Sequence, residues 1–112
     1  MNALKNKVHL VGNLGADPEV KVLESGKKLA RFSVATTEYR RDAEGKTAPE
    51  VQWHRLVAWG KLAEVAERFL KKGSGLVVEG RLSYRNYEDE KGTKRYFTEI
   101  VVNDLVLMPS KR

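Results

Sequence analysis

The chain contains no cysteine in 112 residues, and only two histidines and three prolines. Without thiols, a disulfide framework, thiolate catalysis and cysteine-based zinc sites are excluded. No apolar run approaches the roughly 20 residues of a membrane-spanning helix, and the N-terminal stretch lacks the apolar core of a signal peptide. We therefore expect an intracellular protein with no membrane partner.

The composition predicts one folded domain of modest size. Hydrophobic residues make up 41% of the chain and charged residues 32%, and no internal repeat or low-complexity segment is visible. The formal net charge of +6 favours a polyanionic partner, such as nucleic acid.

Features that could support catalysis are few and isolated. His9 and His54 lie on separate predicted strands, without a nearby nucleophile motif. The carboxylates at 88–90 fall at a predicted hairpin tip, where a solvated turn is more common than a metal site. The segment 72–75 follows a helix and lacks the residue order of a phosphate-binding loop. We expect no catalytic residues, no cofactor and no metal.

Two-residue alternation predicts strands over 5–14, 19–23, 28–39, 50–59, 76–84 and 95–107. An apolar stripe with helical spacing predicts a helix over 61–72, capped by Gly73, and the polar stretch 40–49 reads as an exposed loop. This order predicts an all-β fold, a five-stranded Greek-key oligonucleotide-binding (OB) barrel with one helix and extended hairpin loops. A mixed α+β sandwich is the alternative. We expect the barrel domain to cover 1–108, with 109–112 as a short basic remnant.

The predicted strand at 50–59 carries an unusual face. Trp53, Arg55 and Trp59 are separated by even numbers of residues, so a strand places two indoles and a guanidinium on one face. Such a face can stack bases and meet phosphates, or the tryptophans can belong to the core with the arginine at its rim. Other aromatic residues are interleaved with cations elsewhere. They are Tyr39, Tyr84, Tyr87 and Tyr96, beside Arg40, Arg41, Lys61, Arg85 and Arg95. The joint pattern favours single-stranded nucleic acid as the partner.

Four segments resemble the bacterial single-stranded DNA-binding protein family, at 6–21, 52–74, 78–82 and 95–103. The resemblance implies an OB fold, a homotetramer, and wrapping of single-stranded DNA without catalysis or sequence specificity during replication, recombination and repair. It also implies a bacterial, cytoplasmic and nucleoid-associated location. Stacking positions match Trp53, Trp59 and Tyr87, and His54 matches a subunit-interface position. Phosphate contacts match Lys7, Lys21, Arg55, Lys61, Lys72, Arg85 and Arg95.

Two departures from the family pattern matter. The aromatic stacker expected near the end of the third strand aligns with Arg40, with Tyr39 beside it. Because neighbouring strand residues face opposite ways, only one can stack; we favour Tyr39, and the alternative is Arg40, which would stack through its guanidinium plane. The chain also stops at a basic sequence, 109–112, in place of an acidic tail. Tail-mediated replication and repair partners are therefore not expected from this chain. Two alternative functions stay open, namely an OB-fold protein-docking module of a replication or plasmid assembly, and an RNA-binding barrel.

Overall fold

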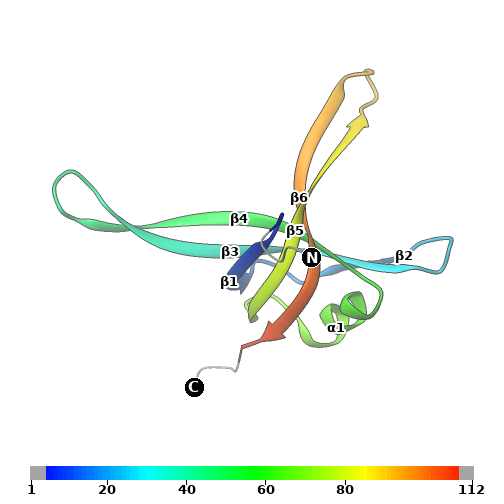
Figure 1. Cartoon of the computed structure of the whole chain (residues 1–112), viewed down its shortest axis with the longest axis horizontal. Coiled ribbons are helices and arrows are strands. Elements are labelled where there is room, and N and C mark those ends of the chain that lie inside the picture. Colours follow the sequence, from blue (N-terminus) through cyan, green and yellow to red (C-terminus); the bar gives the residue numbers. More distant parts are fainter. Residues whose placement is uncertain (1–4, 109–112) are drawn as a thin grey trace.

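Six strands and one helix make up the fold in the computed structural model, which describes residues 5–108 (Figure 1). The strands are β1 (Val8–Leu14), β2 (Glu19–Val22), β3 (Lys28–Arg41), β4 (Thr47–Trp59), β5 (Gly75–Glu88) and β6 (Lys94–Leu107). The helix, α1 (Lys61–Phe69), lies between β4 and β5 in the chain. Every predicted strand and the predicted helix is therefore present.

Five of the strands close into a barrel. The strand order is β1-β5-β6-β4-β3-β2, and an additional pairing of β1 with β3 completes the ring. β2 pairs only with β3, so it lies outside the ring as an extension of the sheet. The β4–β6 pair is parallel and the other pairs are antiparallel. This topology confirms the predicted five-stranded OB barrel.

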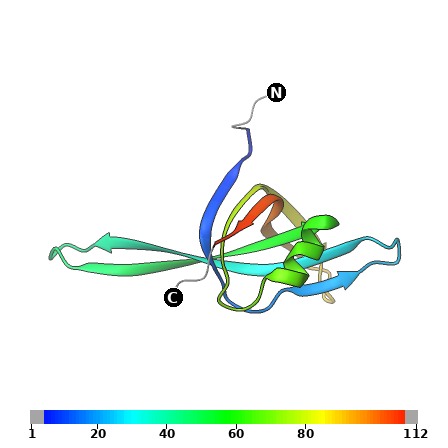
Figure 2. The same cartoon turned by 90° about the horizontal axis from the view of Figure 1, so that it is seen from below.

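The core fills the barrel with one side-chain face from each strand of the ring, as the two-residue alternation predicts. Three small or branched residues after β4 cover one end, namely Ala63, Ala66 and Leu70. Figure 2 shows α1 packed against that part of the barrel. The strand residues of the core are Leu14, Ala30, Phe32, Val34, Leu56, Ala58, Leu76, Val78, Ile100 and Val102.

Two long hairpins project from the barrel as arms, which Figure 1 shows pointing in different directions. In the β3–β4 arm the ladder continues to the pair Arg41–Thr47, so half of the loop expected at 40–49 is strand. The expectation failed because polar composition reports exposure, and both faces of an arm beyond the barrel meet solvent. The turn itself is short, with the Asp42 carboxylate accepting hydrogen bonds from the backbone of Glu44 and Lys46.

The helix is shorter than the predicted 61–72. It ends at Phe69, because Leu70 turns its side chain into the core with extended backbone angles (φ −97°, ψ 141°). Gly73 adopts φ +90° in the following turn, where the Ser74 amide donates to the Lys71 carbonyl, so it is not the helix cap. Within residues 5–108, no helix is both long and apolar enough to cross a membrane.

Candidate nucleic-acid interface

The candidate site occupies the outer face of the sheet, opposite the core. Directly paired residues share a face, so the register identifies its members. Across β3 and β4 the outer-face pairs are Ala35–Trp53, Ser33–Arg55, Arg31–Val57 and Leu29–Trp59. On β2, Lys21 pairs with Leu29 and thereby joins the row that contains Trp59. The face is therefore continuous across three strands.

The same face extends over β6 and β5. Val57 pairs with Val101, which places Glu99 and Phe97 farther along the outer face of β6. Phe97 in turn pairs with Arg85 of β5. Five strands thus contribute to one surface that carries both cations and aromatic rings.

Trp53 is the most exposed tryptophan of this surface. It is 62% exposed, so the alternative that both tryptophans belong to the core is wrong for Trp53. Its indole lies against the backbone of Gly15, where an added Cβ would come within 2.4 Å of the ring carbon Cζ3. Glycine at this position lets the ring pack on one side and leave the rest of its surface open.

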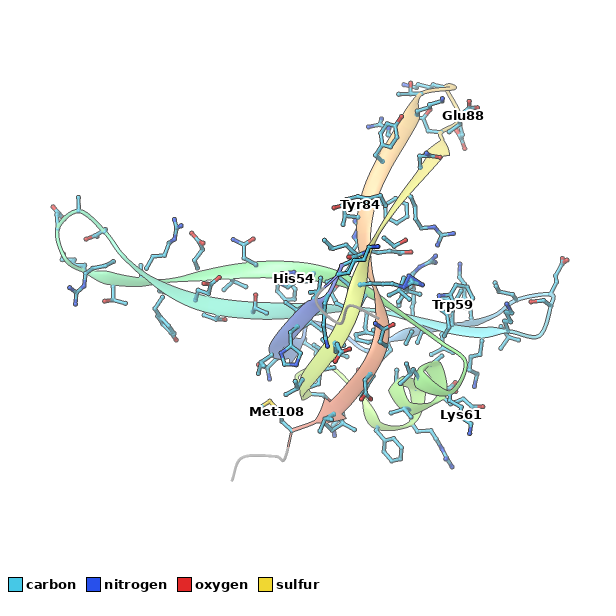
Figure 3. All side chains as sticks on the ribbon, viewed as in Figure 1. His54, Trp59, Lys61, Tyr84, Glu88 and Met108 are labelled. Carbon is cyan, nitrogen blue, oxygen red and sulfur yellow. The ribbon has the colours of Figure 1, made fainter. Side chains whose placement is uncertain are left out.

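Trp59 has a different environment at the far end of β4, close to where α1 begins (Figure 3). It is half-buried, and its cross-strand partner Leu29 is buried. The adjacent Lys61, the first residue of α1, is exposed. Trp59 thus combines a packing role with a partly open ring.

The register bears on the choice between Tyr39 and Arg40. Tyr39 pairs with Pro49 and belongs to the same set of outer-face rows as Trp53, and it is 71% exposed. Arg40 belongs to the opposite face, where its guanidinium lies 3.6 Å from the Glu50 carboxylate. The geometry favours Tyr39 as the ring on the Trp53 face.

Two grooves flank this surface. The first, which we name the Arg31 groove, has a volume of about 540 Å³ and is lined by Asp17, Glu19, Arg31, Arg55, Phe97 and Glu99 among others. The second, the Trp53 groove, has a volume of about 410 Å³ and is lined by Trp53, His54, Arg55, Leu82, Phe97, Thr98 and Ile100. Arg55 and Phe97 line both grooves, so they form the ridge between them.

Glu99 is a site residue that the sequence reasoning missed. It is only 5% exposed, and its carboxylate accepts a hydrogen bond of 3.2 Å from Nη1 of Arg85. Arg85 itself is about half exposed, so the carboxylate lies behind a guanidinium that faces solvent. A buried charge needs such a partner. The signal in the sequence was an acidic residue at the alternate position between Phe97 and Val101, two apolar residues of the same strand face.

The acidic tip of the β5–β6 arm is a structured turn. The Asp89 carboxylate accepts hydrogen bonds from the backbone amides of Lys91 and Thr93 and from Nε of Arg95. The Thr93 amide foremost, with Arg95 and Lys91, holds the pKa of Asp89 below its ordinary value, against a weaker opposing effect of desolvation. Among residues 5–108, no group of three or more His, Cys, Asp or Glu side chains is arranged to hold a metal ion.

The remaining predicted residues are more scattered. Lys7 pairs with Glu79 at 3.5 Å and lines neither groove. Lys72 is exposed beside a third hollow, near Phe69, and its backbone amide donates to Asp17. His54 is half-buried, with Nε2 2.9 Å from the Thr36 hydroxyl. Tyr87 is the register partner of Arg95 in the β5–β6 arm.

A closed five-stranded Greek-key barrel with one helix defines an OB-fold protein, and here exposed rings and arginines lie on the outer face of its sheet. The chain belongs to the single-strand binding protein family, whose model matches residues 5–108. It is 45% identical over 107 residues to "Single-stranded DNA-binding protein 1" of Chlorobaculum tepidum, which covers 95% of this chain. It is 46% identical over 103 residues to the "Single-stranded DNA-binding protein" of Xanthomonas campestris pv. campestris, which covers 92%.

A solved structure gives an independent comparison. The "Plasmodium falciparum SSB complex with ssDNA" superposes with a TM-score of 0.86 at 31% sequence identity, covering 97% of this chain and 100% of that one. The bacterial relatives are longer, since the chain spans 66% of the Chlorobaculum protein and 60% of the Xanthomonas protein. The shared part is the barrel.

Proposed function

We propose that this protein binds and wraps single-stranded DNA without sequence specificity, as part of replication, recombination and repair. The observation that carries the proposal is the continuous outer face on which Trp53, Arg55 and Trp59 lie beside further cations. Every base offers a π-face, so stacking on aromatic side chains tolerates any sequence. No catalytic step is involved.

The proposed contacts follow the resemblance and the register together. We assign base stacking to Trp53, Trp59, Tyr87 and Tyr39. Phosphate contacts are assigned to Lys7, Lys21, Arg55, Lys61, Lys72, Arg85 and Arg95. Among residues 5–108, Arg55 forms no ion pair and lines both grooves, which leaves its guanidinium available for a phosphate. Lys7 has the weakest support, because it lies outside both grooves.

We further propose a homotetramer, with His54 at a subunit interface. Support comes from a cross-strand row of valines, Val11, Val77 and Val106, on the outer face of β1, β5 and β6. Val11 is 52% exposed and Val106 62%. Sedimentation velocity tests this assembly: the wild type should sediment as a tetramer, and Val106→Lys should sediment as a smaller species.

The domain and its location are also proposals. We assign 1–108 to the DNA-binding domain; residues 109–112, the predicted basic remnant, lie outside the described residues. The relatives compared above are bacterial, which supports a location in the bacterial cytoplasm, at the nucleoid, where single strands are exposed.

Tryptophan fluorescence tests the proposed function directly. Oligo-dT should quench the emission strongly, matched duplex DNA should not, and log affinity should fall against log salt with a slope near −0.7 per neutralised phosphate. A stronger response to oligo-U would favour the RNA-binding alternative, since RNA readers contact the 2′-hydroxyl. Absence of quenching would favour the alternative that this protein is an OB-fold protein-docking module.

A further inference from the structure

Two exposed tyrosines of the β5–β6 arm have no role in the site described so far. Tyr84 is 74% exposed and Tyr96 72%. The register places them on the face of the arm opposite to Arg85 and Phe97. Figure 3 shows Tyr84 on the arm, where it leaves the barrel. Rings this large and this exposed contribute little to packing.

The two rings are neighbours on that face. Tyr84 pairs with Thr98, and Tyr96 pairs with Asn86, two residues farther along the ladder. They are therefore diagonal cross-strand partners, a separation of roughly 7–8 Å that aromatic side chains can bridge. The pair presents two π-faces at adjacent positions.

The Trp53 groove leads toward this pair. Its lining includes Leu82 and Thr98, which flank Tyr84 on the same face of the arm. The groove shares Arg55 and Phe97 with the Arg31 groove on the other side of the ridge. A strand stacked on Trp53 therefore has a groove on each side of that ridge, and the Trp53 groove reaches Thr98, the cross-strand partner of Tyr84.

One cation of the arm, Lys94, shares the face of the two tyrosines. Lys94 is two residues from Tyr96 on the same strand and forms none of the ion pairs found among residues 5–108, whereas Arg85 and Arg95 lie on the opposite face and pair with Glu99 and Asp89. The acidic residues of the arm gather beyond the two tyrosines, at 88–90, and the remaining one, Glu99, is buried against Arg85. A phosphate that follows bases stacked on the tyrosines can therefore meet Lys94 on the same face.

We propose that Tyr84 and Tyr96 form a second base-stacking platform for single-stranded DNA, reached from Trp53 through the Trp53 groove. The bound strand then uses both faces of the β5–β6 arm. This inference rests on the proposed function and extends its binding path. It predicts that the platform is used by long strands, while a short strand fills the Trp53 face alone.

The test compares Tyr84→Ala/Tyr96→Ala with Tyr84→Phe/Tyr96→Phe, which keeps both rings. Val22→Ala is the control, because Val22 is an exposed apolar side chain on the face of β2 opposite to Lys21 and lines none of the three hollows. Each variant is titrated by tryptophan quenching with oligo-dT of about 6 nucleotides, near the low end of the range for one OB fold, and with poly(dT). Removal of the rings should leave short-strand affinity within about 2-fold of wild type. It should weaken poly(dT) binding by roughly 5- to 150-fold per stacked ring, the range expected from alanine substitution, and reduce the number of nucleotides occluded.

A tryptophan reporter gives a second readout that does not depend on loss of a side chain. In Tyr96→Trp, poly(dT) should quench more of the emission than in wild type, whereas the short oligo-dT should quench only the signal of the original tryptophans. Failure of wild type to respond to the short oligo-dT would refute the proposed function itself. A normal short-strand response, with unchanged poly(dT) affinity and footprint in the alanine variant, would overturn the platform alone. Altered sedimentation of the DNA-free alanine variant would also overturn it, because it would assign the tyrosines to a contact between protein copies.

Discussion

Trp53 and Trp59 lie six residues apart on the same face of β4, yet they differ in exposure and in the residues they contact. Trp53 faces Ala35 across the ladder and rests on Gly15, and it stays 62% exposed. Trp59 faces the buried Leu29 and is half-buried beside the start of α1. The size of the neighbouring side chains decides the exposure of each ring. The Trp53 indole is therefore open to a ligand, whereas the Trp59 indole is partly open and also packs against the barrel.

The largest effect on DNA binding is expected from Trp53→Ala. Loss of one stacking ring should weaken oligo-dT binding by about 1–3 kcal/mol, and the melting temperature should change little, because the ring is mostly exposed. Fluorescence anisotropy of labelled oligo-dT, together with thermal denaturation, checks both parts. An unchanged affinity would remove Trp53 from the interface.

Gly15→Ala should displace the same ring by steric contact from the side on which it packs. The new methyl group would lie 2.4 Å from Cζ3 of Trp53, so the indole must move off its position. We expect affinity to fall by about 1 kcal/mol, as part of the stacking energy is lost. If Gly15→Ala acts only by moving the Trp53 ring, the double variant Gly15→Ala/Trp53→Ala should bind oligo-dT as weakly as Trp53→Ala alone. Additive losses of affinity in the double variant would contradict this.

Trp59→Ala should lower stability more than DNA affinity, the opposite of what we expect for Trp53→Ala. Because the ring is half-buried, its removal should cost about 2 kcal/mol of the free energy of unfolding, less than the roughly 3–5 kcal/mol typical of a core aromatic residue. The loss of oligo-dT affinity should be under about 1 kcal/mol. Urea denaturation gives the first quantity, and a stability equal to that of Trp53→Ala would erase the proposed difference between the two ends of β4.

Arg55→Gln tests the charge that lies between the two rings. Removal of one phosphate contact should lower the magnitude of the log affinity–log salt slope by about 0.7. Arg40→Gln is the matched control, since Arg40 lies on the opposite face and pairs with Glu50. Equal changes of slope in both variants would mean that the slope reports net charge and not this surface.

Asp89 should show the smallest effect. Its folded pKa is lowered, so its contribution to stability is present above the pKa of the unfolded chain and is lost as pH falls through the folded value. Acidification below the ordinary value of 3.8 should therefore loosen the arm's tip. NMR titration of the Lys91 and Thr93 amides measures this change, and a transition well above pH 4 at those amides would be inconsistent with it.

The barrel could be predicted because its signal is local. Alternation along β3 identified Phe32 and Val34 as members of one face, and both are buried in the core. The exposure of Trp53 could not be predicted, since it depends on Gly15, a residue distant in the chain. The length of the β3–β4 arm was missed for a related reason: a strand without a buried face shows no apolar alternation.

Candidate cations were easier to name than to group. Arg55 and Arg85 followed from their proximity to aromatic residues, and the structure brings both to the same outer face. Lys7 followed from the family resemblance, yet it pairs with Glu79 away from the grooves. Glu99 stayed unrecognised because acidic residues are not expected to support a surface for phosphates. Only the packed barrel shows that it anchors Arg85 from behind.

The two arms should also open locally more often than the barrel does. Its radius of gyration is 16.3 Å, against about 13 Å for a compact domain of this length, and the excess belongs to ribbons outside the barrel. Residues 37–49 are exposed throughout, and a two-stranded ribbon is at best marginally stable alone. Amide hydrogens of the arms should therefore exchange through small local openings, while those of the barrel exchange only on global unfolding. Protection gained in the arms upon binding would map the path of a bound strand residue by residue.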